Sequence, residues 1–315
     1  MIHKRFIPLC AALLMALTAA SARASDGRLD VVVSIKPIHA LVAGVMQGVG
    51  TPHLLLNDQQ SPHHFALKPS QARLLQQAEL VFWVDPSLET PMPGLLASLA
   101  PHAIDIRFMA DQDLVRYQNK ISDDSDDDHE GHDDHEGHGR GHMVNPHIWL
   151  DLENARRMVW SIAATLSAVD PQHAGAYASN AAKLDKRLVD LHEVAKRQFA
   201  SIQRNKFIVQ HDAFIYIERQ FKLPRGLVIA RDHDTPPGTA HLQHLRDLVV
   251  AGVVSCIFDE PQRAGHQIDI VAGTSFVRRA TLDAVGVGLP AGPDLYFDMM
   301  RANYAAFADC LAGTH

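Results

Sequence analysis

The sequence predicts an α/β protein of two lobes, each a parallel sheet covered by helices, joined by one long rigid helix. Short strand-like runs rich in valine, isoleucine and leucine alternate with helical stretches in the first half of the chain, and the same alternation restarts near residue 206. This alternation is typical of parallel sheets, because a parallel connection must return along the sheet and usually does so as a helix.

The first lobe is predicted from four strand-like runs, each bounded by turn or helix signals. The expected strands are 29–35 ("LDVVVSI"), 53–56 ("HLLL"), 79–84 ("ELVFWV") and 103–106 ("AIDI"), and the expected helices between them are 37–48, 70–77 and 93–100. Asp151 is suited to cap a further helix after "NPHIWLD". We therefore assign residues 25–170 to an N-terminal lobe.

The linking helix is predicted over residues 171–204. After Pro171 this stretch has no further proline, and Leu184, Leu188, Leu191 and Val194 recur at three- and four-residue spacing. A continuous helix is stiffer than a glycine-serine linker, so we expect little movement between the lobes. The second lobe is assigned to residues 205–315, with strands expected at 206–210 ("KFIVQ"), 226–230 ("GLVIA"), 255–259 ("SCIFD") and 279–283 ("RATLD").

The first 24 residues have the pattern of a cleaved export signal. Positive charge in "MIHKR" precedes the apolar run "FIPLCAALLMALTAA", and "ARA" ending at Ala24 matches a signal-peptidase site. Cys10 is not preceded by the small residues expected before a lipid-attachment cysteine. The sequence therefore predicts an exported chain that begins at Ser25 and has no other apolar run long enough to insert into a membrane.

Cleavage after Ala24 would leave Cys256 and Cys310 as the two remaining cysteines. An even pair in an oxidising compartment usually closes, so we predict a disulfide between them. The alternative is two buried free cysteines.

The charge of the chain is concentrated in one insert. The formal charge of −7 becomes −10 when Lys4, Arg5 and Arg23 leave with the leader, and residues 123–142 alone carry −8, so the rest of the chain is close to neutral. A nucleic-acid or anionic-membrane partner would require a basic face, and no run of lysine and arginine supplies one. The insert is too polar to form a core, so we expect a disordered loop.

Three histidines follow strands or stiffened loops. His63 lies in "SPHHFALKPS" after the second expected strand, His147 in "NPHIWLD", and His211 in "VQHDAF" at the end of "KFIVQ". Open α/β sheets bind ligands in the crevice at the carboxyl ends of their strands, so these side chains from two lobes are expected to share one site. Three imidazoles favour zinc, and a carboxylate or water can fill the fourth tetrahedral position. Asp283, at the end of "RATLD", is the best-placed carboxylate.

The order of these motifs resembles a known family. "SPHHFALKPSQ", "VFWVDPSLE", "NPHIWLD", "QHDAFIYIERQFKL", "CIFDEPQ" and "TLDAVG" resemble the periplasmic zinc-binding proteins of bacterial ABC importers, the ZnuA type, over essentially the whole mature chain. The resemblance implies two α/β lobes bridged by a long helix, with Zn²⁺ in the cleft on His63, His147 and His211, and a histidine-rich loop before the second ligand motif. It also implies that Cys256 and Cys310 form the family's disulfide.

The chain departs from the family pattern beside the first ligand. Some members carry a glutamate immediately before that histidine, where this chain has Pro62, so Asp283 or water must complete the site. His64 follows His63 directly and is a possible accessory ligand, but neighbours in an extended loop point apart, and we favour His63. Related manganese-binding proteins tend to have a glutamate at the position of His211, so the imidazole favours zinc.

The histidine-rich insert has two interpretations. As an accessory collector or sensor, it would raise the local supply of metal beside the main site. As a solvated loop, it would bind metal without consequence. Its candidate accessory ligands are His129, His132, His135, His138 and His142.

Two functions from different classes remain. The first is a non-catalytic protein that captures zinc in the periplasm and delivers it to an inner-membrane ABC permease, acting as a monomer. The second is an exported zinc hydrolase, for which three histidines and an open position would also suit. The sequence has neither an "HExxH" nor a Gly-x-Ser-x-Gly motif, which argues against an enzyme. A measurement of substrate turnover would distinguish the hydrolase from the zinc-binding protein.

Overall fold

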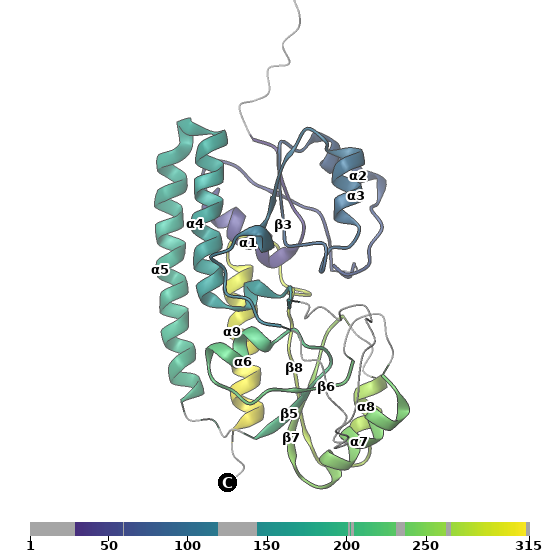
Figure 1. Cartoon of the computed structure of the whole chain (residues 1–315). Coiled ribbons are helices and arrows are strands. Elements are labelled where there is room, and N and C mark those ends of the chain that lie inside the picture. Colours follow the sequence, from purple (N-terminus) through teal and green to yellow (C-terminus); the bar gives the residue numbers. More distant parts are fainter. Residues whose placement is uncertain are drawn as a thin grey trace, which may run out of the picture.

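The computed structural model describes residues 29–58, 60–118, 144–200, 202, 205–230, 237–262 and 266–312. Two four-stranded parallel sheets form two lobes, and a pair of long helices runs along one edge of both (Figure 1). The predicted fold class is therefore confirmed.

The N-terminal lobe has the strand order β2-β1-β3-β4. Its strands are β1 (Val31–Val33), β2 (His53–Leu54), β3 (Leu80–Trp83) and β4 (Ile104–Arg107), and its helices are α1 (Lys36–Val45), α2 (Pro69–Gln77) and α3 (Met92–Leu99), with a 3-10 turn at Phe108–Ala110. Because β2 and β3 lie on opposite sides of β1, the strand order reverses there, and a crevice opens at the carboxyl ends of the strands.

The C-terminal lobe repeats this order as β6-β5-β7-β8. Its strands are β5 (Lys206–Val209), β6 (Leu227–Val228), β7 (Val254–Asp259) and β8 (Arg278–Thr281), and its helices are α6 (Ile215–Gln220), α7 (Thr239–Val250), α8 (His266–Ala272) and α9 (Leu295–Leu311). The reversal point here lies between β5 and β7, which carry His211 and Glu260 just beyond their carboxyl ends.

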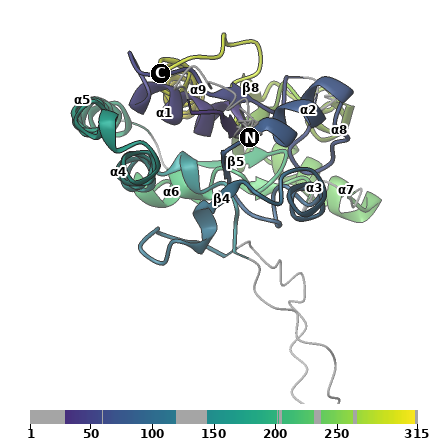
Figure 2. The same ribbon diagram turned by 90° about the horizontal axis from the view of Figure 1, so that it is seen from above.

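Helices α4 (Leu152–Val169) and α5 (Ala174–Phe199) lie side by side along one edge (Figures 1 and 2). The predicted linking helix begins as a 3-10 turn, Pro171–His173, and α5 ends at Phe199. Asp170 organises this start, because its carboxylate accepts hydrogen bonds from His173 and Tyr177, 2.7 Å each.

The helix α5 packs against both lobes. Its first half meets α1, where a Cβ added to Gly44 would lie 2.7 Å from the Leu184 side chain, so that close approach requires glycine. Its last residue, Phe199, packs edge-on against Tyr304 of α9, with ring centroids 5.5 Å apart. One apolar core cluster includes residues from β1 to α9 and so joins the two lobes.

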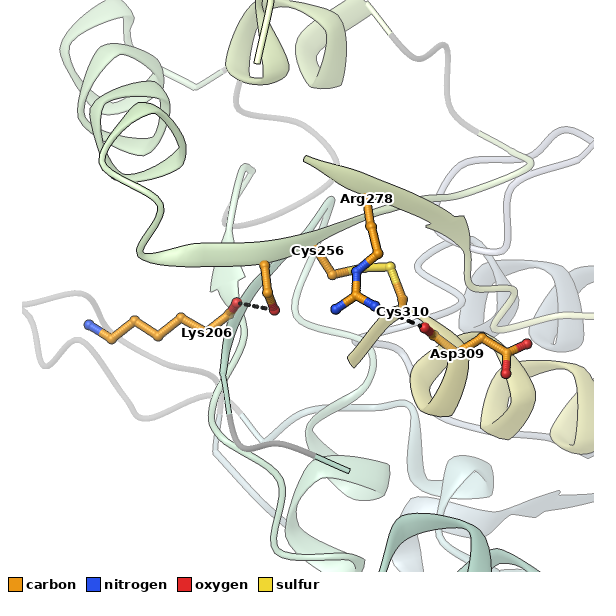
Figure 3. The surroundings of a disulfide bond; sticks show 6 residues. Lys206, Cys256, Arg278, Asp309 and Cys310 are labelled. Atoms are coloured by element: carbon orange, nitrogen blue, oxygen red, sulfur yellow. Dashed lines mark hydrogen bonds between the residues drawn. A yellow bond between two sulfur atoms is a disulfide. The ribbon is translucent and has the colours of Figure 1, made fainter. Parts of the chain in front are cut away.

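The disulfide joins Cys256 of β7 to Cys310 of α9, with Cα atoms 5.8 Å apart (Figure 3). Next to it, Arg278 of β8 donates a hydrogen bond to the carbonyl of Asp309, 3.4 Å (Figure 3). The predicted pairing is confirmed, and it anchors the C-terminal helix to its sheet. Within the described part of the chain, no helix combines the length and apolar content that a membrane span requires.

Candidate metal centre

Three histidines distant in the sequence come together between the lobes. One ring nitrogen from each of His63, His147 and His211 lies within 4.8 Å of the others, and they form the one group of potential metal ligands found among the described residues. His63 comes from the loop between β2 and α2, His147 precedes the 3-10 turn Ile148–Leu150, and His211 follows β5. Two of these histidines thus come from segments before α4 in the N-terminal lobe, and the third comes from the C-terminal lobe.

The spacing of two of these nitrogens matches a tetrahedral metal site. The Nε2 atoms of His147 and His211 lie 3.4 Å apart, and both rings are buried. Two nitrogens about 2.05 Å from a zinc ion at the tetrahedral angle would be about 3.3–3.4 Å apart. The separation of the two Nε2 atoms is therefore the one that a tetrahedral ion bound to both would require.

The ring of His147 is oriented by Asn145. The Asn145 Oδ1 accepts hydrogen bonds from the His147 backbone N–H and from ring Nδ1, both 3.0 Å. An Nδ1 that donates leaves Nε2 as the unprotonated donor atom, the arrangement that metal-binding histidines need. On its other side the ring packs against Trp149, whose indole N–H donates to the Ala284 carbonyl at 2.7 Å.

The ring of His211 is oriented by a buried carboxylate. Its Nδ1 donates to Glu260 Oε1 at 2.6 Å, and its backbone N–H reaches the same oxygen at 3.3 Å. Glu260 follows β7, the strand beside β5, so the reversal of strand order brings the two together. A carboxylate behind a histidine raises the basicity of the ring and strengthens its bond to a metal.

The loop around His63 is held by the Gln60 side chain. Gln60 Nε2 donates to the Ala66 carbonyl at 3.0 Å, and the His63 backbone N–H donates to Ser61 Oγ at 3.3 Å. His63 is half-buried, while the neighbouring His64 is exposed and lies outside the group of three. Residues 62–64 lie in bends of the loop, and His63 rather than His64 joins the group of three.

Asp283 lines the same pocket, but its oxygens have other partners. Its Oδ1 accepts from the backbone N–H groups of Val285 and Gly286, 2.9 Å each, and its Oδ2 from Val287 at 2.6 Å. Burial raises the pKa of this carboxyl above its ordinary value, although the three N–H groups oppose the shift. The structure does not group Asp283 with the three histidines.

Asn145 and Glu260 were not predicted from the sequence. Their positions in the sequence could have indicated them. Asn145 stands two residues before His147, and Glu260 directly follows the strand β7, which is adjacent to the strand that precedes His211. The accessory candidates His129, His132, His135, His138 and His142, the loop 123–142 and the leader 1–24 lie outside the described residues.

Comparison with known proteins agrees with this architecture. A family model described as "Zinc-uptake complex component A periplasmic" matches residues 31–310. The high-affinity zinc uptake system protein ZnuA of Paracoccus denitrificans is 33% identical over 335 residues, 99% of each chain. Its namesake in Brucella suis is 31% identical over 308 residues, 90% of this chain and 92% of that protein.

Solved structures share the fold at lower identity. A crystal structure of ZnuA superposes with a TM-score of 0.75 at 20% identity, covering 90% of this chain and all of that one. The Pseudomonas aeruginosa solute-binding protein FpvC in complex with Mn²⁺ gives a TM-score of 0.75 at 21% identity, over 90% of this chain and 98% of that chain. The family match spans nearly the whole chain, and the resemblance seen in the sequence is confirmed: the chain belongs to the ZnuA family of periplasmic zinc-uptake components.

Proposed function

We propose that this chain captures zinc in the periplasm through His63, His147 and His211 and delivers it to an inner-membrane ABC permease. The relatives named high-affinity zinc uptake proteins support the role, since they match almost the full length of the chain. All three histidines come from one chain, so the site needs no second copy and a monomer suffices. Export through a leader cleaved after Ala24 belongs to the same proposal.

The observation that carries the proposal is the buried pair of Nε2 atoms 3.4 Å apart. Each ring of this pair has its other nitrogen engaged, one with Asn145 and one with Glu260. Imidazole nitrogens at tetrahedral spacing suit zinc better than manganese, which prefers oxygen ligands in an octahedral arrangement.

For the fourth position we propose water rather than Asp283. The Asp283 carboxylate accepts three backbone hydrogen bonds, and turning it toward the metal would leave those N–H groups without their acceptor. A water ligand is also easily displaced, which suits a protein that must release its cargo.

The contacts of the pocket do not favour the hydrolase alternative. A metal hydrolase needs a base beside the metal-bound water. Glu260 and Asp283 line the pocket, but Glu260 accepts from His211 and Asp283 from its own loop. The family is one of solute-binding transport components. We expect stoichiometric binding and no hydrolysis of esters, phosphate esters or peptides by the zinc-loaded protein.

The loop 123–142 is proposed as an accessory collector. Its histidines and carboxylates would bind metal weakly and raise the zinc supply near His147. A chain lacking residues 123–142 should then lose weak sites but keep the tight one.

The test is a competition titration of the mature chain against a chromophoric chelator, with zinc and with manganese. We expect one tight zinc site, much weaker manganese binding, and survival of the zinc site in the chain without residues 123–142. Loss of the tight site with the loop, or its persistence after all three histidines are replaced by alanine, would reject the proposed site.

A further inference from the structure

One amide side chain connects the loops that carry the two buried ligands. Asn145 accepts from His147 through Oδ1, and its Nδ2 donates to the backbone carbonyl of Asp212, the residue after His211. A backbone N–H on one side and a backbone carbonyl on the other fix which end of the amide is oxygen and which is nitrogen. The side chain therefore contacts both ligand loops at once.

The loop that carries His211 and Asp212 is itself held by ion pairs. The Asp212 carboxylate forms a two-pronged ion pair with Arg225, at 2.8 and 3.0 Å, and Arg225 also pairs with the buried Glu218. Glu218 in turn accepts from the Gly226 backbone N–H at 3.1 Å. On the Asn145 side, the Tyr216 hydroxyl donates to the Asn145 carbonyl at 2.6 Å. Residue 145 is thus tied to the C-terminal lobe twice, through its side-chain Nδ2 and through its backbone carbonyl.

We propose that Asn145 is a positioning residue that orients His147 and holds it at the separation from His211 that a tetrahedral ion requires. The inference rests on the proposed function, since it assumes that these two histidines bind the metal. Asn145 does not touch the metal. It acts by fixing the proton of His147 on Nδ1 and by tying residue 145 to residue 212, so that the Nε2 atoms stay 3.4 Å apart.

Two substitutions separate the two contacts. Asn145→Asp keeps an acceptor for His147 but replaces the donor to the Asp212 carbonyl by an oxygen, so the loops should separate. Asn145→Ala removes both contacts. Loss of a group that orients a metal ligand typically weakens affinity by roughly 10–100-fold, so we expect that loss of zinc affinity for Asn145→Ala and a smaller loss for Asn145→Asp.

The buried Asn180 provides a matched control. Its Nδ2 donates to the backbone carbonyls of Val45 and Gln47, at 3.0 and 2.8 Å, and it joins α5 to the end of α1 away from the pocket. Asn180→Ala should lower thermal stability and leave the zinc affinity of the folded protein unchanged.

The experiment uses the full mature chain and measures zinc and manganese affinity, the visible absorption spectrum of bound Co²⁺, and the thermal midpoint of the metal-free protein. We expect both Asn145 variants to change the intensity of the Co²⁺ bands and to lower the ratio of zinc to manganese affinity, while Asn180→Ala changes the thermal midpoint alone. Wild-type Co²⁺ spectra and zinc affinity in either Asn145 variant, or equal losses in the Asn145→Ala and Asn180→Ala variants, would overturn the inference. Zinc binding by His147→Ala at wild-type strength would instead reject the proposed function itself.

Discussion

The three histidines of the site differ in how the protein holds them. His147 and His211 are buried, each with its second ring nitrogen hydrogen-bonded to a buried group, and their Nε2 atoms are already at tetrahedral spacing. His63 is half-buried on a loop held by the exposed contact between Gln60 and Ala66. Its ring centroid lies 5.8 and 6.5 Å from those of the other two, against 5.1 Å within the pair.

From this difference we infer that the buried pair and His63 have different roles in the site. A pair that is arranged before metal arrives loses little entropy on binding and sets the geometry. A third ligand on a surface loop can move in to complete the site and move out to release the ion. We therefore expect the pair to determine affinity and selectivity, and His63 to determine how fast zinc leaves.

The largest loss of zinc affinity is expected when one histidine of the buried pair is replaced. His147→Ala or His211→Ala should weaken zinc binding by more than roughly 100-fold, the upper end of the loss seen when only an outer partner is removed. His63→Ala should weaken it less and act mainly through faster dissociation, measured by stopped-flow transfer of zinc to a chelator. Equal losses and equal release rates for the three variants would contradict this difference in roles.

The next effect concerns the carboxylate behind His211. Glu260→Ala removes the acceptor of the ring Nδ1–H and should weaken zinc binding by roughly 10–100-fold, whereas Glu260→Gln keeps a carbonyl acceptor and should lose less. The same competition titration measures both. If Glu260→Gln lost as much as Glu260→Ala, the negative charge rather than the orientation of the ring would be the important feature.

A smaller loss of zinc affinity is expected when a contact between the two lobes is removed. The buried Lys36 ammonium pairs with Asp58 and donates to the carbonyls of Gly286 and Leu289 at 3.0 and 2.8 Å. Lys36→Met should lower the free energy of unfolding by about 1–3 kcal/mol, because a buried carbonyl loses its donor, and should change zinc affinity by less than about tenfold.

The control for this variant is Lys186→Met on α5. Lys186 and Asp190 form an exposed pair, with side chains 75% and 61% accessible, so its removal should change stability by less than about 1 kcal/mol. Urea denaturation of the metal-free proteins measures both. Equal stabilities for the two variants would show that the contact between the lobes contributes nothing.

The smallest effect on affinity is expected at Asp283. Asp283→Asn keeps one acceptor for its own loop but brings an amide N–H₂ to the Val287 N–H, so the thermal midpoint should fall. Zinc affinity should drop by less than about tenfold, because water and not Asp283 is the fourth ligand in the proposed site. A loss as large as that of His63→Ala would instead assign Asp283 as the fourth ligand.

Most of the fold could be predicted from the sequence, because its strands are short, apolar and separated by helical periodicity. The expected strand 255–259 is β7 (Val254–Asp259), and the expected helix 70–77 is α2 (Pro69–Gln77). The long helix expected after residue 170 is present as α5 (Ala174–Phe199), and helical spacing alone does not show that Asp170 organises a 3-10 turn before Ala174.

Part of the candidate site could also be predicted, because strand positions can be recognised in the sequence. His211 comes directly after a recognisable strand, and parallel strands bring the residues beyond their carboxyl ends to the same edge of the sheet. The partners of the ligands could not be found in this way. Glu260 lies 49 residues from His211, and only the pairing of β5 with β7 places them at 2.6 Å.

The sequence by itself determined the two α/β lobes, the long helix, the paired cysteines and the three histidines, because these depend on local periodicity, residue type and position after a strand. Only the tertiary structure decided which ring nitrogens of His147 and His211 face each other, that Asn145 and Glu260 hydrogen-bond the opposite nitrogens, and that Asp283 accepts from its own loop. The physical reason is that the role of a polar side chain is set by the donors and acceptors within about 3 Å of it. The folded backbone fixes these groups, whether they come from 49 residues away, as Glu260 does for His211, or from the same loop, as for Asn145 and Asp283.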